Sequence, residues 1–476
     1  MKINESVKNV LKKLKKAVSK MIIDGYLKIP IEEEKLNKLL KLECLCNNPE
    51  YYTRKKMSFS LKDIPRKISI RKKIGNEFWY PRFLAEKYIK NFKEHLKVEY
   101  GTNIDFKTKI TLRDFQIPVV EETLKFMKGH LGGCIQALTG TGKSVMSLDV
   151  MSKLKKTTCI VVHKKFLANQ WVEYIKEFLL IPENRIGIIN GNKIDIEDKW
   201  IVVCLVQSLL AKSTSQPESF YRQFGMVIFD EVHHFSARTF QKVIGKFPCR
   251  YRLGISATPC RKDGMEDVFF KHIGEICFTS EVRQITPNVY IIKGNTLIAS
   301  ERPFKNYLGK VQLWKVEEFL CNSEIRNRKI IENIISAVKA ERRVLILSGR
   351  RKHLELLMGT LLIELKQKHV HTTLGFYMGG MKEEELKKSE KCMIIFGTFS
   401  MSSEGLNLPL VDTLILATPK SSIEQSIGRI LRKVDGKKTP IVIDFADNIG
   451  ICKAMLKKRK DLYKELKYNI KKEYIL

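Results

Sequence analysis

The chain has 476 residues and 44% hydrophobic content, which is enough for about two to four packed domains. Its formal charge is +34, from 86 Lys and Arg against 52 Asp and Glu. This excess predicts a polyanionic partner, with nucleic acid favoured over an anionic membrane surface, although the codon bias of an A/T-rich genome would also enrich lysine. Without an apolar run of about 18 residues or an apolar N-terminal core region, we expect neither a membrane-spanning helix nor a secretion signal.

The 11 cysteines are scattered and include no C-x-x-C pair. Only Cys44 and Cys46 lie close together, and their spacing suits neither a zinc site nor a redox motif. We therefore expect buried free thiols in a reducing compartment, with a metal site as the minority alternative.

Residues 1–107 are expected to form a small, basic α+β accessory domain. Amphipathic and alternating patterns predict short helices at 5–20, 31–42 and 86–92, and strands at 57–62 and 67–71. An aromatic cluster at residues 77–83 lies among basic residues. Such a cluster can stack nucleic-acid bases, but a small core with a solvated rim is the favoured interpretation, because stacking needs exposed rings.

Residues 108–282 alternate apolar runs with helical patterns, which is typical of a parallel sheet covered by helices on both faces. Residues 283–476 repeat this scheme and end in a predicted lysine-rich helix from residue 449. Strands are predicted at 133–137, 158–163, 200–205, 225–229, 251–256, 343–348, 392–396, 413–417 and 440–444. The fold class is therefore α/β, with two tandem parallel-sheet domains after the accessory domain.

A phosphate-binding loop, Ala137-Leu-Thr-Gly-Thr-Gly-Lys-Ser144, lies between a predicted strand and a predicted helix. Its glycines allow close approach of backbone N–H groups to a polyphosphate, and the helix N-terminus adds positive charge. The lysine would reach the β- and γ-phosphates, and the serine hydroxyl would hold Mg²⁺. The residues predicted to bind nucleotide here are Thr139, Gly140, Thr141, Gly142, Lys143 and Ser144.

The apolar stretch 226–229 ends in two adjacent carboxylates, Asp230 and Glu231. At the carboxyl end of a parallel strand, Asp230 can hold Mg²⁺ and Glu231 can polarise an attacking water. A surface acidic pair is the alternative, but it does not explain why the pair follows a phosphate-binding loop within one β/α domain.

Further polar groups occur at the ends of other elements. Gln116, before a predicted helix, can read adenine through two hydrogen bonds. Ser256-Ala-Thr258 ends an apolar strand. Gln425, Arg429 and Arg432 share one face of a predicted helix, and arginines there can neutralise a transferring phosphoryl group. Solvated arginines on an amphipathic helix are the alternative.

The order and spacing of these motifs over residues 112–448 resemble those of superfamily 2 helicases. Within that superfamily, the segments 159–171, 186–191, 230–237, 256–264, 414–420 and 425–433 look like the helicase of large nucleocytoplasmic DNA viruses. That group is typified by the poxvirus transcript-release helicase and its iridovirus and asfarvirus relatives, and XPB-type helicases are more distant. Where the cellular pattern has Pro-Thr, this chain has His163-Lys164.

The resemblance implies two RecA-like domains, at residues 108–282 and 283–476, with ATP in their cleft and nucleic acid across both. It implies catalytic roles for Lys143, Asp230, Glu231, Arg429 and Arg432. It places Arg113, Gln116 and Gln425 at ATP, Mg²⁺ at Ser144 and Asp230, and coupling roles at His233, Ser256 and Thr258. The nucleic-acid contacts that it implies are His163, Lys164, Gln170, Gln207, Ser208, Thr398, Glu404 and Gly405.

We therefore expect an ATP-dependent nucleic-acid translocase that acts as a monomer, in the host cytoplasm or virion if viral. DNA is favoured as the substrate, with RNA or an RNA–DNA hybrid as alternatives, and the transcription machinery is a further expected partner. Two rival hypotheses are a motor that remodels protein–nucleic-acid complexes without unwinding and a binding scaffold whose motor is vestigial.

Overall fold

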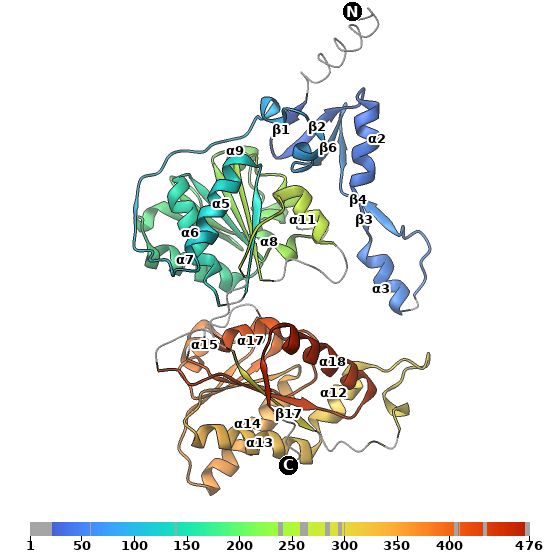
Figure 1. Cartoon of the computed structure of the whole chain (residues 1–476), viewed down its shortest axis with the longest axis vertical. Coiled ribbons are helices and arrows are strands. Elements are labelled where there is room, and N and C mark those ends of the chain that lie inside the picture. The colour runs from blue at the N-terminus through green and yellow to red at the C-terminus, as the bar shows by residue number, and fades with distance from the viewer. Residues whose placement is uncertain are drawn as a thin grey trace, which may run out of the picture. The chain divides into compact units, whose positions relative to one another are not determined.

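The computed structural model of the chain divides into two compact units, one ending at Glu281 and the other beginning at Val282 (Figure 1). The structure describes residues 21–471 except 58, 139, 237–240, 258–264, 281–285, 294–297, 299, 404–407, 409 and 432–435. The helix predicted at residues 5–20 lies outside the described residues. None of the helices within those described ranges is long and apolar enough to cross a membrane.

The first unit begins with an N-terminal subdomain, residues 21–106, built on an antiparallel sheet of order β1-β2-β6-β5. Its elements are β1 Ile22–Ile23, β2 Tyr26–Pro30, α2 Glu34–Glu43, β3 Leu45–Asn47, α3 Pro49–Met57, β4 Lys67–Ser69, β5 Lys72–Ile74, β6 Glu77–Pro81, α4 Leu84–Tyr88 and the 3₁₀-helix η1 Phe92–His95. Helix α2 confirms the helix predicted near residues 31–42. The strand predicted at 57–62 is wrong, because Met57 ends a helix and the side chains of Met57 and Phe59 are 54% and 59% exposed, so these apolar residues face no core.

The rest of the first unit is an eight-stranded sheet of order β12-β11-β13-β9-β14-β15-β8-β16, parallel except at β12. Its strands are β8 Gly133–Ala137, β9 Thr158–Val162, β11 Ile186–Asn190, β12 Lys193–Asp195, β13 Ile201–Leu205, β14 Met226–Asp230, β15 Tyr251–Ser256 and β16 Ile276–Ser280. The helices include α5 Ile117–Gly129, α6 Lys143–Leu154, α7 Lys165–Phe178, α8 Val206–Leu210, α9 Glu218–Arg222, α10 Gln241–Ile244 and α11 Glu266–Ile273, with a small ladder of β7 Lys107–Thr108 and β10 Leu179–Leu180. Separate apolar clusters pack on its two faces, as expected for buried parallel strands.

Two fully buried arginines join the N-terminal subdomain to this sheet. Arg82 donates hydrogen bonds to the carbonyls of Asp24, Leu131 and Cys249. Arg252, on β15, donates to the carbonyl of Gly25 at 2.8 Å and to two further carbonyls. Burial lowers the pKa of both guanidinium groups. Because the bonds run in both directions across the interface, the subdomain and the sheet form one packed unit.

The second unit contains a seven-stranded, fully parallel sheet of order β19-β20-β18-β21-β22-β17-β23. Its strands are β17 Asn288–Lys293, β18 Val344–Ser348, β19 Leu374–Tyr377, β20 Ile394–Thr398, β21 Thr413–Leu416, β22 Ile441–Ala446 and β23 Asn469–Lys471. The helices are α12 Leu313–Cys321, α13 Glu324–Lys339, α14 Arg351–Gln367, α15 Glu383–Ser389, α16 Phe399–Ser403, α17 Glu424–Ile430 and α18 Gly450–Glu465. Both units are RecA-like α/β folds, so the predicted fold class is confirmed.

The C-terminal region differs from the single helix predicted from residue 449. Helix α18 ends at Glu465, Lys467 adopts a positive φ of 51°, and β23 then pairs with β17. Tyr463, Leu466 and Tyr468 are buried in the core of the second unit. Tyr463 is buried within the helix, whereas Leu466 and Tyr468 are buried after the helix has ended, so the chain that follows α18 adds to this core.

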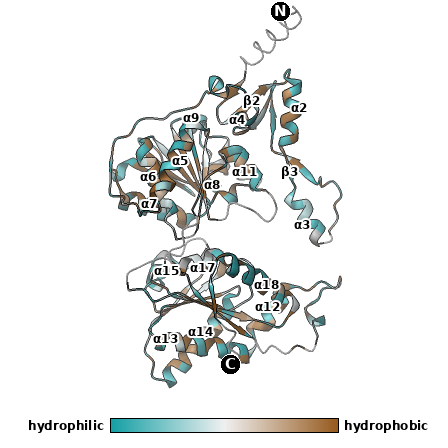
Figure 2. Cartoon of the chain, viewed as in Figure 1, coloured by the Kyte–Doolittle hydropathy of each residue, from teal (hydrophilic) through white to brown (hydrophobic). Residues whose placement is uncertain are grey.

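Hydropathy follows this architecture in both units. Figure 2 shows the central strands of each sheet as hydrophobic, while the helices carry mixed surfaces. The ten described cysteines are all free thiols and eight of them are buried, as predicted. Desolvation raises the pKa of buried thiols such as Cys134 and Cys159, which keeps them in the uncharged form.

Candidate nucleotide and coupling site

The phosphate-binding loop begins where β8 ends and closes at the first turn of α6. Gly140 and Gly142 have φ of 91° and 87°, a region that favours glycine. Lys143 donates from Nζ to the carbonyl of Ala137 at 3.1 Å, so its ammonium group lies over the loop. Thr139, also predicted to bind nucleotide, lies outside the described residues.

Gln116 packs directly against this loop. A Cβ atom built on Gly142 would lie 2.5 Å from Gln116 Nε2, so a larger residue at this position would collide with the amide. Gln116 is buried, and its Oε1 accepts a hydrogen bond of 2.9 Å from the backbone N–H of Arg113. The side chain of Arg113 is exposed. The structure therefore brings the predicted adenine-reading amide next to the predicted phosphate loop.

Asp230 ends the fully buried strand β14, and one strand, β15, separates it from β8. Its Oδ2 accepts a hydrogen bond of 2.8 Å from Nε1 of Trp171, and its Oδ1 accepts one of 2.9 Å from the N–H of Glu231. Burial, followed by the charge of Glu231, raises the pKa of Asp230 to about 6, while Trp171 and Lys143 oppose the rise. A cation beside this carboxylate would relieve its desolvation.

Glu231 sits in the left-handed backbone region, with φ of 49°, which is uncommon for a residue with a side chain and clusters at functional sites. Its Oε2 accepts a hydrogen bond of 3.4 Å from Ser256 Oγ and lies 3.4 Å from His233 Nδ1. His233 Nδ1 also lies 2.9 Å from Ser256 Oγ. The predicted coupling residues His233 and Ser256 thus contact the predicted water-activating carboxylate.

Three imidazole rings extend this network along the edge of the sheet. The ring centroids of His233 and His234 are 4.3 Å apart, and those of His234 and His163 are 3.9 Å apart. His163 follows β9, and its carbonyl accepts a hydrogen bond of 2.8 Å from Nε2 of Gln207. A continuous series of contacts therefore joins Gln207, a predicted nucleic-acid residue, to Glu231. We define the rings of His163, His234 and His233 as the histidine stack.

The other residues predicted to contact nucleic acid differ in their exposure. Lys164 and Gln170 are half-buried, and Gln170 donates to the hydroxyl of Tyr174 at 2.8 Å. Ser208 is buried and accepts a hydrogen bond of 2.9 Å from the N–H of Gly191. Ser208 therefore holds the backbone at Gly191 by a hydrogen bond, and its contact with nucleic acid stays a prediction.

Fewer of the predicted residues are described in the second unit. Thr398 is buried at the end of β20, with its Oγ1 3.2 Å from Ser400 Oγ. Gln425 and Arg429 lie on α17, where the backbone is described but these two side chains are not. Arg432, Glu404, Gly405 and, in the first unit, Thr258 lie outside the described residues.

The side chains at the loop fit a Mg²⁺ ion that arrives with a nucleotide. The hydroxyl of Ser144 and the carboxylate of Asp230 are the hard oxygen ligands that Mg²⁺ prefers, and Mg²⁺ usually keeps several waters. Both carboxylate oxygens of Asp230 already accept hydrogen bonds, which favours contact through water. No group of three or more metal-ligating side chains occurs among the described residues, so the nucleotide would supply the remaining ligands.

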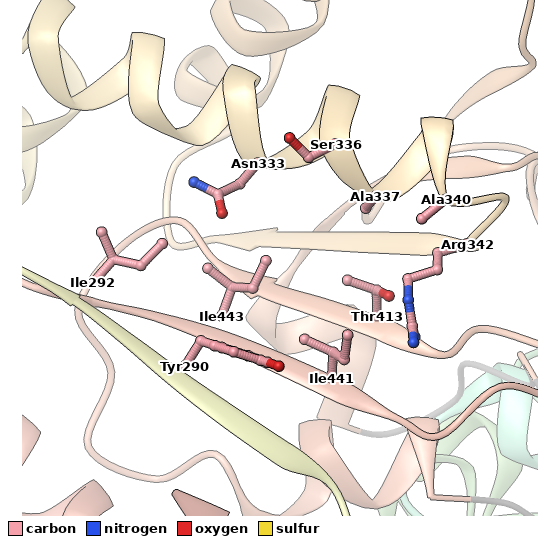
Figure 3. Close-up of a pocket in the computed structure, with 10 residues that line it drawn as sticks. All are labelled: Tyr290, Ile292, Asn333, Ser336, Ala337, Ala340, Arg342, Thr413, Ile441 and Ile443. Carbon is pink, nitrogen blue, oxygen red and sulfur yellow. The ribbon is translucent and has the colours of Figure 1, made fainter. Parts of the chain in front are cut away.

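A separate cavity of about 270 Å³ lies in the second unit, between α13 and strands β17, β21 and β22 (Figure 3). Half of its ten lining residues are aliphatic, and Figure 3 shows Ile292 and Arg342 at opposite ends. Arg342 is engaged elsewhere, since it donates to the carbonyl of Thr439 at 3.0 Å. None of the predicted site residues lines this cavity.

A phosphate-binding loop and an Asp-Glu pair at the carboxyl ends of strands in one parallel sheet define a P-loop nucleotide hydrolase. Comparison with known proteins narrows this class. Residues 109–261 match the family described as type III restriction enzyme, res subunit. L396 of Acanthamoeba polyphaga mimivirus, assigned as an ATP-dependent RNA helicase, is 37% identical over 77% of this chain and 70% of its own length. The chain therefore belongs to the same family of viral helicases as L396, and it is an enzyme of the helicase class.

Other relatives show lower identity. Helicase 161L of Invertebrate iridescent virus 6 is 27% identical over 84% of this chain and 91% of its own length. Helicase D10 of Escherichia phage T5 is 27% identical over 71% of this chain and 72% of its own length. The crystal structure of T4 UvsW covers 95% of this chain and 98% of its own, with 17% identity and a TM-score of 0.41.

Sequence reasoning missed Trp171 and His234 as residues of the site. A Trp whose indole N–H is buried needs an acceptor, and the apolar face of α7 places Trp171 in the core near the end of β14, but its partner could not be read from the sequence. His234 is adjacent to a predicted coupling residue. Only the fold brings its ring onto His163, which is 71 positions earlier in the chain.

Proposed function

We propose that this chain hydrolyses ATP with Mg²⁺ and uses the reaction to move along nucleic acid. The observation that carries the proposal is the position of Glu231, which accepts a hydrogen bond from Ser256 and follows β14, with one strand, β15, between β14 and the strand that leads into the phosphate-binding loop. In this role Glu231 orients the attacking water, Lys143 binds the β- and γ-phosphates, and Asp230 holds the metal through water. Bound Mg²⁺ would neutralise charge on the phosphates.

The proposal assigns the remaining catalytic groups to the second unit. Arg429 and Arg432 would neutralise charge on the transferring phosphoryl group, as arginine fingers do, and Gln425 would bind the nucleotide. ATP would then favour a closed arrangement of the two units, and hydrolysis and product release would favour an open one. This assignment rests on the resemblance of residues 425–433 to the helicase pattern.

We propose further that nucleic-acid binding reaches the hydrolytic site through the histidine stack. A strand held near Gln207 and Lys164 would fix the position of His163, and the ring contacts would transmit that position to His233, Ser256 and Glu231. Coupling of this kind needs an element with two arrangements that both ligands bias. The strained backbone of Glu231 is suited to that role.

The substrate and process follow from the relatives only by analogy. The names of the mimivirus and African swine fever virus relatives describe RNA helicases, and the motif pattern resembles transcript-release helicases. We therefore propose an RNA–DNA hybrid or DNA track in viral transcription, carried out in host cytoplasm or virion by a monomer. The rival hypotheses are a remodeller that separates no strands and a scaffold with a vestigial motor.

The test compares ATP hydrolysis by the wild-type chain and by Lys143→Ala, with and without single-stranded nucleic acid. Stimulated hydrolysis that is lost in a folded Lys143→Ala protein supports the motor. Absence of hydrolysis by the wild-type chain at saturating nucleic acid would instead favour the scaffold. Strand displacement measured beside release of a stalled transcript would distinguish unwinding from remodelling.

A further inference from the structure

A cavity of about 570 Å³ lies within the first unit, between the N-terminal subdomain and helices α9 and α10. The subdomain contributes residues of β2, β5 and β6, among them Tyr26, Lys72 and Trp79. Tyr221, on α9, and Lys246, just after α10, line the opposite wall. Its volume falls within the range of about 300–1,000 Å³ that is typical of small-ligand sites. No residue predicted for the nucleotide site lines it.

The lining carries more positive than negative charge after its ion pairs are counted. Five cationic side chains line the cavity, against two carboxylates. Lys28 pairs with Asp24, and Arg222 with Glu218. Lys72, Lys242 and Lys246 form no ion pair with any carboxylate in the described part of the chain. Burial and the nearby charge of Lys72 lower the pKa of Lys246, so an anion between these ammonium groups would relieve their repulsion.

Two of these lysines are held in place by tyrosines. Lys72 Nζ donates to the hydroxyl of Tyr26 at 2.6 Å and lies 4.5 Å from the centre of that ring. Lys246 Nζ donates to the hydroxyl of Tyr221 at 3.4 Å and lies 5.2 Å from its ring centre. Both tyrosines are buried, so each is a fixed support for an ammonium group. Positioning before a ligand arrives reduces the entropy lost on binding.

Trp79 supplies a different chemistry at the same cavity. It is half-buried, its Nε1 donates to Glu77 at 3.0 Å, its ring lies 5.4 Å from that of Tyr26, and Lys28 Nζ lies 4.2 Å from its ring centre. A base can stack on this anchored indole by displacing the flexible Lys28 side chain from its ring. Cations held on tyrosines beside an indole suit a nucleotide, which has both a phosphate and a base, whereas the carboxylates of an acidic peptide would use only the lysines.

We propose that this cavity is a second nucleic-acid site, in which Lys72 and Lys246 bind phosphates of a single strand and Trp79 stacks an adjoining base. The inference rests on the proposed function, because a motor that moves on nucleic acid brings such a strand to the first unit. The site would hold the strand outside the helicase motifs, with no sequence preference, since it offers backbone and stacking contacts only.

The test is fluorescence anisotropy with the full chain and a labelled single strand about 20 nucleotides long, as DNA and as RNA, at several salt concentrations. The salt slope is the decrease in the logarithm of the binding constant per tenfold increase in salt concentration. Removing two phosphate contacts in Lys72→Ala/Lys246→Ala should reduce this slope by about 1.4. Between about 50 and 200 mM salt, the wild type should then lose about sevenfold more affinity than the variant. Lys35→Ala/Lys38→Ala removes the same charge from exposed positions of α2 and should leave the slope unchanged.

A second variant addresses the stacked base. Trp79→Ala should weaken binding at least about fivefold with an unchanged salt slope, and Trp79→Tyr should restore most of the affinity. Wild-type affinity and slope in both cavity variants would overturn the proposal. So would polyglutamate that competes as well as a single strand of equal charge. ATP hydrolysis at saturating nucleic acid is a separate readout: its absence in the wild-type chain would reject the motor, whereas loss of the cavity effect alone would leave the motor intact.

Discussion

The histidine stack leads to a quantitative prediction about coupling. Replacing His234 with alanine removes ring contacts at 3.9 Å to His163 and at 4.3 Å to His233. Each aromatic contact contributes about 0.5–1.5 kcal/mol, so up to about 1–3 kcal/mol of coupling is lost. Coupling of that size corresponds to about a 5–150-fold change. We expect His234→Ala to hydrolyse ATP normally without nucleic acid but to lose stimulation by at least about fivefold.

The assay measures ATP turnover at saturating nucleic acid and in its absence. His163→Ala should give a similar loss, and the double variant should lose little more than either single variant, since both break the same series of contacts. His371→Ala, at an exposed position of the second unit, is the control and should behave as wild type. Full stimulation in a folded His234→Ala protein would refute the proposed route.

Three further predictions concern Asp230 and the division of the site. The pKa of Asp230 is about 6 in the folded chain and 3.8 as a reference value, so the folded chain holds this proton more tightly. Without nucleotide, the free energy of unfolding should therefore fall by about 3 kcal/mol as the pH rises from about 4 to about 6. Urea titrations of the wild type and of Asp230→Asn should differ in that pH range. Trp171→Phe removes a hydrogen bond that lowers this pKa, so the acidic limb of the pH–rate profile should move to higher pH, while Trp200→Phe, at a half-buried position, should leave it in place. A fragment of residues 1–281 should bind Mg·ATP in equilibrium dialysis but hydrolyse it at least about 1,000-fold more slowly than the full chain, if the arginines of the second unit complete the site.

The parallel strands could be predicted because burial on both faces leaves continuous apolar runs. Strands such as β9 and β18 are buried at every position, and their sequences are apolar except for Thr158 and Ser348 at one end of each. The strand predicted at 57–62 failed because alternation in sequence does not reveal whether a core is available for the apolar side. Edge strands such as β12 and β23 were missed, since they are short and largely exposed.

The nucleotide residues could be predicted because a loop, a lysine and a carboxylate pair have fixed chemical roles at strand ends. The contacts that connect them could not, because they depend on register between strands far apart in sequence. Ser256 meets Glu231 only because β15 lies beside β14, with Asp230 opposite Ile255. The cavity at Trp79 could not be predicted from the sequence either, since its lining combines residues 24–79 of the N-terminal subdomain with residues 216–248.

In the proposed mechanism, Glu231 activates the water that attacks ATP, and nucleic acid stimulates this hydrolysis. The most direct test is ATP turnover by Glu231→Gln at saturating single-stranded nucleic acid, with nucleotide binding measured in the same protein. We predict binding within a few-fold of wild type and turnover reduced by at least about 100-fold, while Glu121→Gln at an exposed position of α5 remains active. Wild-type turnover in a folded Glu231→Gln protein would rule out this role of Glu231.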